Sequence, residues 1–298
     1  MDDAIRKAEV LVEAHPYIRA FAGKTVVVKV GGSIMDEPET LGRLLDDVSF
    51  MCTVGMRPVL VHGGGKGITA AMKEAGLEAQ FVQGRRYTDE RTLAIAEHVL
   101  ISTINAPMIE RLKSMGTRSL GLHSLSSCVV FAERLMLAGE GGRKVDIGLV
   151  GQVTGVSSDV LQALVEAGTV PVIAPIARDR AGGKLNINAD SVAGHVAAAM
   201  KAEKLVLVSD THGIRLSEKP EDLARHLSRK QIEELVDSGV ITAGMLPKVE
   251  ASLIALEAGV RKAHIIDGRI PHALLLEVYT EKGIGTEIVL EEGQQVSV

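Results

Sequence analysis

The sequence predicts an α/β protein built as a three-layer αβα sandwich, with a mainly parallel central sheet covered by helices on both faces. Short aliphatic runs typical of buried strands, at residues 25–30, 59–61, 170–174 and 205–208, alternate with segments of helical periodicity. The 298 residues are enough for a full core in one large domain or two lobes. Tryptophan is absent, and only 3 Tyr and 4 Phe are present, so that core must be aliphatic.

The first half of the chain begins with a helix outside the sheet. Apolar residues recur at helical spacing from Ile5 to Val12, and Pro16 interrupts the pattern before it resumes at Tyr17, which predicts a kinked helix. The strand at 25–30 follows, then a helix near 39–54 and the strand at 59–61. A helix near 68–75 and a long helix near 90–113 complete this half.

The second half opens with brief extended runs between glycines at 121–156, which predict hairpins. Ser157 and Ser158 are expected to cap a helix that ends near 167, and Asp190 to cap another that ends near 200. Residues 214–243 are charged and irregular. A helix near 247–258 and strands at 263–266 and 287–290 follow. The expected units are 1–22, 23–175 and 176–298.

Composition excludes several classes of function. A formal net charge of -5 and few aromatic rings argue against a nucleic-acid partner. Cys52 and Cys128 are isolated, which fits buried thiols in a reducing cytoplasm. The acidic start has no signal-peptide pattern, and no apolar run predicts a membrane span. No histidine or carboxylate cluster at metal-ligand spacing predicts a dedicated metal site. The expected protein is soluble and cytoplasmic.

Two glycine turns are the most informative local features. The strand that carries Lys29 ends at Gly31 and Gly32, and the next strand ends in a run from His62 to Gly65 before a predicted helix. Free N–H groups at such turns, together with the positive end of a helix dipole, attract phosphate or carboxylate. Neither run is a dinucleotide fingerprint or a Walker A loop. Each is also compatible with an ordinary tight turn, but two of them suggest two anionic substrates.

Seven short motifs occur in an informative order: Lys29-Val-Gly-Gly32, His62-Gly-Gly-Gly65, Gly84-Arg-Arg-Tyr-Thr-Asp89, Gly148-Leu-Val-Gly-Gln-Val153, Asn186-Ile-Asn-Ala-Asp190, Ser209-Asp210 before Gly213, and Gly244-Met-Leu-Pro-Lys248. Over essentially the whole chain this series resembles the N-acetylglutamate kinases of the amino acid kinase family, in their arginine-sensitive form. The resemblance implies the amino acid kinase fold, with the amino-acid substrate and a dimer contact in the N-lobe and ATP in the C-lobe. It also implies transfer of the ATP γ-phosphoryl group to the γ-carboxylate of N-acetyl-L-glutamate, a step of arginine biosynthesis.

The resemblance assigns the chemistry to three charged residues. Lys29 and Lys248 would contact the transferring phosphoryl group from the substrate side and the nucleotide side, and Asp190 would hold both ammonium groups. A γ-carboxylate is already ionised at neutral pH, so no general base is needed. Without the family match, the alternative for Lys29 is an edge-strand lysine that points to solvent, which its strongly apolar strand disfavours. Lys248 would be as readily a helix-surface lysine, and Asp190 would be a helix cap.

The remaining site residues follow from the same resemblance. Arg86 would bind the α-carboxylate, Asn186 the acylated amino group, and Gly64 and Gly65 would donate N–H groups, whereas Arg85 is expected to be a solvated surface charge. His62 is interpreted as structural rather than as a base. ATP, with Mg²⁺ on its phosphates, would bind at a set of six residues: Gly31, Gly32, Ser209, Asp210, Gly213 and Gly244.

Regulation is also implied by resemblance. The N-terminal helix would join dimers into a hexamer, and arginine would bind as inhibitor near Tyr17, His264, Glu277, Gly283 and Gly285. A PII-type regulator is a further possible partner. Without the N-terminal helix, residues 264–286 would be interpreted as an ordinary strand, helix and turn. Two departures from the family pattern, at residues 123–127 and at Thr211-His212, affect the substrate loop and the adenine pocket.

Two other functions remain open at this point. The chain could be a kinase acting on another amino-acid carboxylate, of the aminoadipate or aspartate type. It could also be a catalytically silent relative that only senses arginine. Retention of Lys29, Asp190 and Lys248 favours an enzyme, because packing alone gives no reason for three separated polar positions of this kind.

Overall fold

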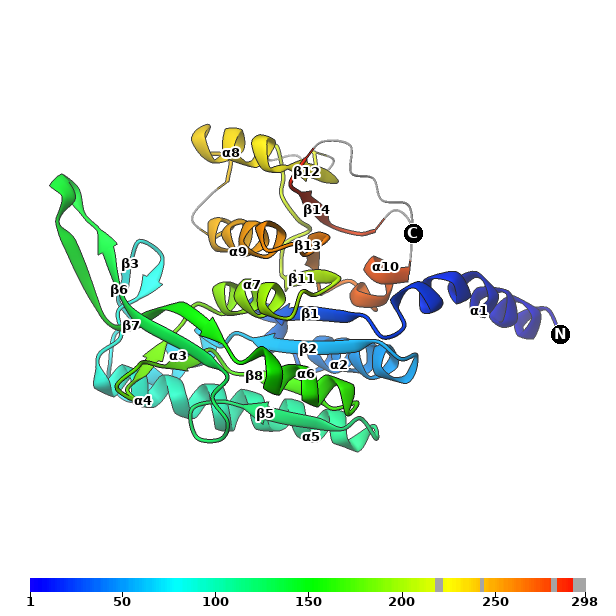
Figure 1. The fold of residues 1–298 in the computed structure, drawn as a ribbon, viewed down its shortest axis with the longest axis horizontal. Helices are drawn as coiled ribbons and strands as arrows, with labels where there is room; N and C mark the ends of the chain where they lie inside the picture. Colours follow the sequence, from blue (N-terminus) through cyan, green and yellow to red (C-terminus); the bar gives the residue numbers. More distant parts are fainter. Residues whose placement is uncertain (218–221, 242–243, 280–282, 292–298) are drawn as a thin grey trace.

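An eight-stranded sheet forms the centre of the computed structural model, which describes residues 1–298 except 218–221, 242–243, 280–282 and 292–298 (Figure 1). The strand order is β12-β14-β13-β11-β1-β2-β8-β5. The bounds are β1 Thr25–Val30, β2 Arg57–His62, β5 Ser119–Leu122, β8 Val170–Ile173, β11 Lys204–Ser209, β12 His226–Ser228, β13 Lys262–Asp267 and β14 Thr286–Val289. Every neighbouring pair is parallel except β13 and β14, so the predicted mainly parallel sheet is confirmed.

Helices cover both faces of this sheet, and the residues of β1 alternate between the two helix layers. Val26, Val28 and Val30 pack in a cluster with α2 (Pro38–Thr53), α5 (Ala106–Ser114) and α10 (Ala273–Tyr279). Val27 packs in a second cluster with α6 (Ser158–Glu166), α7 (Ala189–Ala199), α8 (Arg229–Asp237) and α9 (Leu246–Glu257). Because side chains alternate along a strand, Lys29 faces the same side as Val27, toward α7 and α9.

The long helix predicted near residues 90–113 is present. It runs through α4 (Glu90–His98), a π-helical segment η2 (Val99–Asn105) and α5. By length and composition alone this helix could cross a membrane, but core helices of soluble proteins pass the same test. Its buried apolar residues, Ala96, Val99, Leu100, Met108 and Leu112, belong to hydrophobic clusters of the fold.

The predicted hairpins between 121 and 156 are one long hairpin. It consists of β6 (Val130–Ala138) and β7 (Lys144–Val156), joined through the turn η3 (Glu140–Gly142), and it projects from the body (Figure 1). Its base closes into a small barrel with β9 (Ile176–Arg178) and β10 (Lys184–Asn186). A shorter hairpin, β3 (Phe81–Val82) and β4 (Arg85–Arg86), lies against it, since Gln83 Nε2 donates to the Ala138 carbonyl at 2.9 Å.

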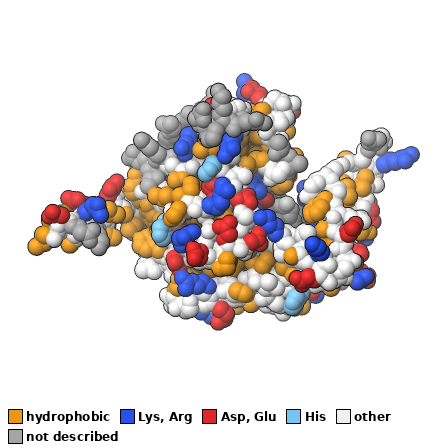
Figure 2. All heavy atoms as spheres, turned by 180° about the vertical axis from the view of Figure 1, so that it is seen from behind, with side chains coloured by type: hydrophobic (Ala, Val, Ile, Leu, Met, Phe, Trp, Pro, Cys, Tyr) orange, Lys and Arg blue, Asp and Glu red, His pale blue; other side chains and the backbone are white. Residues whose placement is uncertain are grey.

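The N-terminal helix α1 (Asp2–Phe21) extends away from the sheet, with Pro16 inside it as expected (Figures 1 and 2). It contacts the body through α10. Four of its apolar side chains, Ile5, Val10, Leu11 and Val12, are exposed.

Three local predictions are wrong. Residues 214–243 contain β12 and α8, and α8 begins with a capping box between Ser228 and Gln231. Ser157 occupies the cap position of α6, but its side chain makes no capping hydrogen bond there. The cap of α7 is Asn188, whose side chain accepts from the N–H groups of Asp190 and Ser191, so the Asp190 side chain is not the cap.

Candidate active site

A cleft of about 240 Å³ opens at the carboxyl ends of β1 and β2, where ligands commonly bind in open parallel sheets. The turns after these strands, the hairpin β3–β4 and the start of α7 form its walls. Its polar and glycine lining consists of Lys29, Gly31, Gly32, Gly63, Gly64, Gly65, Gly84, Arg85, Arg86, Asn186, Asn188 and Asp190. The structure thus brings the four residues expected to bind the amino-acid substrate, Gly64, Gly65, Arg86 and Asn186, into one cavity.

Asp190 lies between the two predicted catalytic lysines. Its Oδ1 is 2.9 Å from Lys29 Nζ, and its Oδ2 is 3.6 Å from Lys248 Nζ. Lys29 comes from the central strand β1, paired with β2 and β11, so the edge-strand alternative is wrong. Lys248 lies in the first turn of α9, which packs closely on α7. Side chains from three elements, β1, α7 and α9, therefore meet at this site.

The charges in this trio do not balance. Burial alone would raise the pKa of Asp190, but Lys29 and Lys248 outweigh that effect and hold the pKa below its ordinary value. Burial lowers the pKa of Lys248, while Asp190 opposes this shift. Asp190 therefore stays ionised. The trio carries a net positive charge beside the cleft, which suits a bound anion.

The glycine turns leave space where side chains would otherwise stand. A Cβ at Gly31 would collide with the Lys29 ammonium group, so glycine lets that group lie over the backbone. Gly64 precedes helix α3 (Gly65–Glu74), and a Cβ there would lie 2.7 Å from Leu100. Because α3 begins at Gly65, its first N–H groups have no partner within the helix, and Gly64 and Gly65 line the cleft.

Arg86 is a buried cation on the substrate side of the cleft. Its Nη2 donates to the Gly65 carbonyl at 2.8 Å and to Thr69 Oγ1 at 2.7 Å, and its guanidinium lies 4.9 Å from the centre of the Phe81 ring. Burial lowers the pKa of Arg86. Among the described residues no carboxylate pairs with it. A buried guanidinium with neutral partners only is suited to bind a ligand carboxylate.

Asn186 and His62 have different surroundings. Asn186 lines the cleft, and its Nδ2 donates to Thr88 Oγ1 at 3.2 Å. His62 is fully buried, with Nδ1 3.0 Å from the Gly63 carbonyl and Nε2 3.0 Å from Asn105 Nδ2. Burial lowers the pKa of His62 to about 4. Both ring nitrogens are occupied, which supports a structural role.

The six residues expected around ATP are only partly brought together. Asp210 faces the first turn, where its Oδ2 accepts from the Ser33 N–H at 3.0 Å and a Cβ at Gly32 would touch its carboxyl group. Ser209 is buried at the end of β11 beside it. Gly213, with φ 130°, packs against Thr286. Gly244 is exposed, just before α9.

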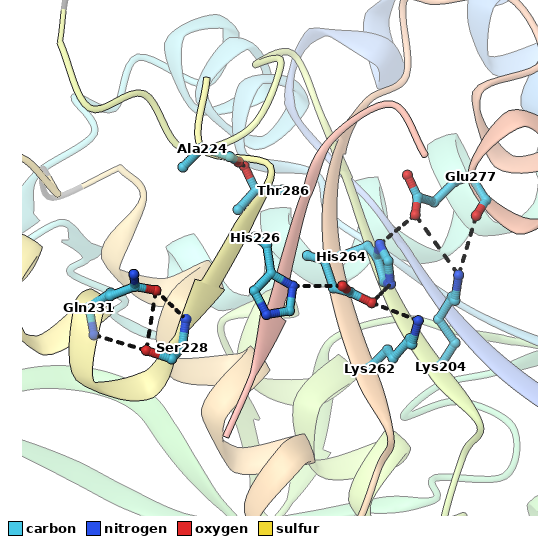
Figure 3. A network of polar contacts seen from close by, with 10 residues as sticks. Lys204, Ala224, His226, Ser228, Gln231, Lys262, His264, Glu277 and Thr286 are labelled. Carbon is cyan, nitrogen blue, oxygen red and sulfur yellow. Dashed lines mark hydrogen bonds and ion pairs between the residues drawn. The ribbon is translucent and has the colours of Figure 1, made fainter. Parts of the chain in front are cut away.

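His264 and Glu277, two of the five residues expected to bind arginine, contact each other in a buried cluster beneath α10 (Figure 3). Glu277 is ion-paired with His264 and lies 3.9 Å from Lys204, and its Oε2 accepts from the Ile284 N–H at 2.9 Å. A Cβ at Gly283 would meet this carboxylate, and one at Gly285 would strike the Ile265 carbonyl. Tyr17 is half-buried on α1.

The two departures from the family pattern lie outside the cleft lining. Ser124 contacts Glu97, which also binds Lys184 at 2.7 Å, so residues 123–127 are tied to α4 and β10. His212 Nδ1 lies 3.0 Å from the buried Asp267 carboxylate.

The structure also adds cleft residues that the sequence did not indicate, namely Phe81, Asn188 and Arg85, which was expected to be a solvated charge. The one sequence signal for Arg85 at the cleft is the alternation of side chains along a strand, which directs Arg85 and Arg86 to opposite faces of the hairpin.

Comparison with known proteins agrees with this geometry. Residues 24–267 match the amino acid kinase family. An acetylglutamate kinase from Symbiobacterium thermophilum is 44% identical over 288 residues, covering 96% of this chain and 98% of the relative. One from Synechococcus elongatus is 46% identical over 287 residues, covering 96% of this chain and 93% of the relative.

Solved structures give the same fold. An N-acetylglutamate synthase from Neisseria gonorrhoeae, complexed with coenzyme A and N-acetyl-glutamate, superposes with a TM-score of 0.82 at 26% identity. The match covers 94% of this chain, which spans 63% of the synthase chain. An isopentenyl phosphate kinase, with a TM-score of 0.62 at 19% identity over 89% of this chain and 100% of that one, shares the fold alone. The resemblance inferred from the motif series is confirmed, and this chain belongs to the amino acid kinase family.

Proposed function

We propose that this chain is a cytoplasmic acetylglutamate kinase, which transfers the γ-phosphoryl group of ATP to the γ-carboxylate of N-acetyl-L-glutamate in arginine biosynthesis. The observation that carries the proposal is the Asp190 carboxylate between Lys29 and Lys248, at the edge of a cleft that also holds the unpaired Arg86. The acetylglutamate kinases at 43–46% identity over nearly the whole chain support the same substrate.

The reaction needs alignment and positive charge rather than a base. One oxygen of the ionised γ-carboxylate attacks the γ-phosphorus, the bond from that phosphorus to the bridging oxygen of ADP breaks, and ADP leaves with the electron pair. Two anions must approach each other, so the ammonium groups of Lys29 and Lys248 stabilise charge that spreads over the phosphoryl oxygens. Asp190 orients both lysines and accepts no proton.

The two substrates would enter from opposite sides of this trio. On the N-lobe side, Arg86 binds the α-carboxylate, Asn186 the acetamido group, and the N–H groups at Gly64 and Gly65 the γ-carboxylate. On the C-lobe side, the turn at Gly31 and Gly32 and the residues near Asp210 surround the nucleotide phosphates. Asn186 lies beyond the expected boundary near residue 175, and Gly31 and Gly32 lie before it, so each substrate would contact residues of both lobes.

Magnesium would accompany the nucleotide. Within the described ranges no group of three or more histidine, cysteine, aspartate or glutamate side chains is placed to hold a metal ion, and both oxygens of Asp190 face lysines. The donor set therefore fits Mg²⁺ held chiefly by phosphate oxygens. When bound, the ion supplies charge neutralisation of the phosphates.

The test is ADP release by the purified protein with a panel of acceptors: N-acetyl-L-glutamate, N-acetyl-L-aspartate, L-glutamate, L-aspartate and L-2-aminoadipate. We expect turnover with N-acetyl-L-glutamate alone, and hydroxylamine should trap the acyl phosphate as a hydroxamate. Turnover confined to another acceptor would assign a different carboxylate kinase. Arginine binding without any turnover would assign a silent sensor.

We further propose that arginine inhibits this enzyme and that α1 joins dimers into a hexamer. The exposed apolar residues of α1 and its contact with α10 support this view, because α10 carries Glu277. Glu277 already contacts His264 and Lys204, so an arginine guanidinium would have to displace one of them. Deletion of residues 1–20 should leave dimers by light scattering and remove arginine inhibition. A truncated protein that stays hexameric and arginine-sensitive would refute this.

A further inference from the structure

Arg85 lies where two cavities meet. It lines the cleft that holds Lys29 and Asp190, and it also lines a groove of about 30 Å³ beside that cleft. The groove lies between the hairpin β3–β4, the start of α7 and the outer side of α9, which contributes Pro247, Glu250 and Ile254. One side chain of the substrate-side hairpin therefore reaches the helix that carries Lys248.

The direction of Arg85 follows from its neighbour. Arg85 and Arg86 are the two residues of β4, and adjacent residues of a strand point to opposite faces. Arg86 points toward α3, where it donates to Gly65 and Thr69. Arg85 is therefore directed to the other face of the hairpin, toward the groove.

Arg85 and Glu250 have opposite charges and line the same groove. Across the part of the chain that the structure describes, neither side chain makes an ion pair or a side-chain hydrogen bond. Another carboxylate of α9, Glu257, is paired with Arg229 at 2.6 Å. Glu250 is exposed, and Arg85 is half-buried beside it in the same groove.

The hairpin itself is attached on two sides. Its strands contain two residues each, and its turn residues Gln83 and Gly84 have φ 48° and 75°. A two-stranded hairpin of this size is marginal by itself. Gln83 and Val82 hold it to the long hairpin, and Arg86 holds it to α3. A further attachment, to α9, would fix Arg86 relative to Lys248.

We propose that Arg85 is a positioning residue, which forms an ion pair with Glu250 across the groove when the cleft is filled. Arg85 adjoins Arg86, and Glu250 lies two residues after Lys248. The pair thus connects the residue that holds the acylated amino acid to the residue that holds the nucleotide. The nature of these ligands rests on the proposed function, whereas the pairing rests on the groove.

The test is a charge exchange between the two positions. Arg85→Glu and Glu250→Arg should each raise the KM for N-acetyl-L-glutamate by about fivefold, the upper range for an exposed pair, with kcat nearly unchanged. The double variant should return KM to within about twofold of the wild type. Arg91→Glu is the matched control, because it makes the same charge change at an exposed residue that lines neither cavity.

Two kinetic outcomes would overturn the pairing. Unchanged KM in both single variants would show that the pair does not form. A rise in the double variant equal to the product of the single rises would show that Arg85 acts on the substrate directly, without Glu250.

Amide hydrogen exchange gives a readout that does not depend on the acceptor. With ADP bound, amides of residues 81–86 should exchange faster in each single variant than in the wild type, and at the wild-type rate in the double variant. A protein that fails to phosphorylate N-acetyl-L-glutamate would refute the proposed function, while exchange would still decide the pairing. Equal exchange in all four proteins would overturn it.

Discussion

Two buried groups of charges in this molecule look alike but differ in balance. The cleft trio has two lysines around one carboxylate, Asp190, and it opens onto a cavity of about 240 Å³. In the cluster beneath α10, the Glu277 carboxylate contacts one lysine, Lys204, and the ring of His264 (Figure 3). His264 also lies 3.7 Å from Glu287.

The difference separates the site of phosphoryl transfer from a cluster that contributes to the stability of the fold. In the C-terminal cluster, burial of Glu277 is offset by His264, Lys204 and the Ile284 N–H. In the cleft one cation remains in excess, and the neighbouring Arg86 has no acidic partner in the described part of the chain. A buried excess charge is costly unless a ligand neutralises it. The cleft is therefore expected to respond to substitution in turnover, and the cluster in stability.

The largest effect should come from Asp190→Asn. The amide keeps the size of the side chain but cannot hold two ammonium groups, so kcat should fall by about a thousandfold. The fold should persist because Asn188 caps α7. Asp159→Asn, at the same position in α6, is the control and should keep wild-type rates. Wild-type turnover in Asp190→Asn would remove it from the site.

Lys29→Ala and Lys248→Ala should each lower kcat by about a hundredfold, because each removes charge that acts as the phosphoryl group transfers. Steady-state kinetics with both substrates would measure this. Lys113→Ala, which removes an exposed lysine paired with Glu110, is the control. Near-normal kcat in either cleft variant would show that the lysine in question is structural.

Glu277→Gln should test the other side of the comparison. The pKa of Glu277 is lowered to about 2, so its contribution to stability is present above the unfolded-state pKa of about 4.5 and is lost as the pH falls toward 2. That contribution is on the order of 3 kcal/mol. Denaturant unfolding at pH 7 and at pH 3 should show a large loss at pH 7 and a smaller one at pH 3. An equal loss at both values would contradict the proposed charge balance.

The smallest effect should come from Arg86→Lys. A point charge cannot reproduce the planar fork, so the KM for N-acetyl-L-glutamate should rise about tenfold while ATP binding is almost unchanged. Arg111→Lys, in an exposed ion pair with Asp46, is the control. Unchanged affinity for the acylated amino acid would place Arg86 outside the binding site.

The sequence predicted the layers from local pattern, and it predicted the polar centre from the family resemblance. An apolar strand that carries one lysine before a glycine pair already indicated that Lys29 is not a surface residue. The order of the seven motifs, which carries the family resemblance, indicated that Asp190 and Lys248 belong to the same site. These residues lie 161 and 58 positions apart in the chain, so only the family resemblance, and not spacing, could bring them together.

The misses have physical causes. Asn186, Asn188 and Asp190 all offer side chains that can cap a helix, and propensity alone does not select the middle one. Helix α8 was missed although Ser228 and Gln231 form a recognisable capping box, because charged residues dominate that region. The barrel depends on pairing between β6, β7, β9 and β10, which no local pattern specifies.

The π-helical segment η2 has a consequence for how the site tolerates insertion and deletion. It sets the rotational phase between α4 and α5, so that Leu100 and Ile104 abut Gly64 while Asn105 reaches His62 and the Val172 carbonyl. Loss of one residue from a helix rotates everything beyond it by about 100°. The shape of the Gly64 turn therefore depends on the number of residues in this helix, and not only on their identity. A single-residue deletion between Val99 and Asn105 would act on the substrate cradle without changing any residue that lines it, apart from Leu100.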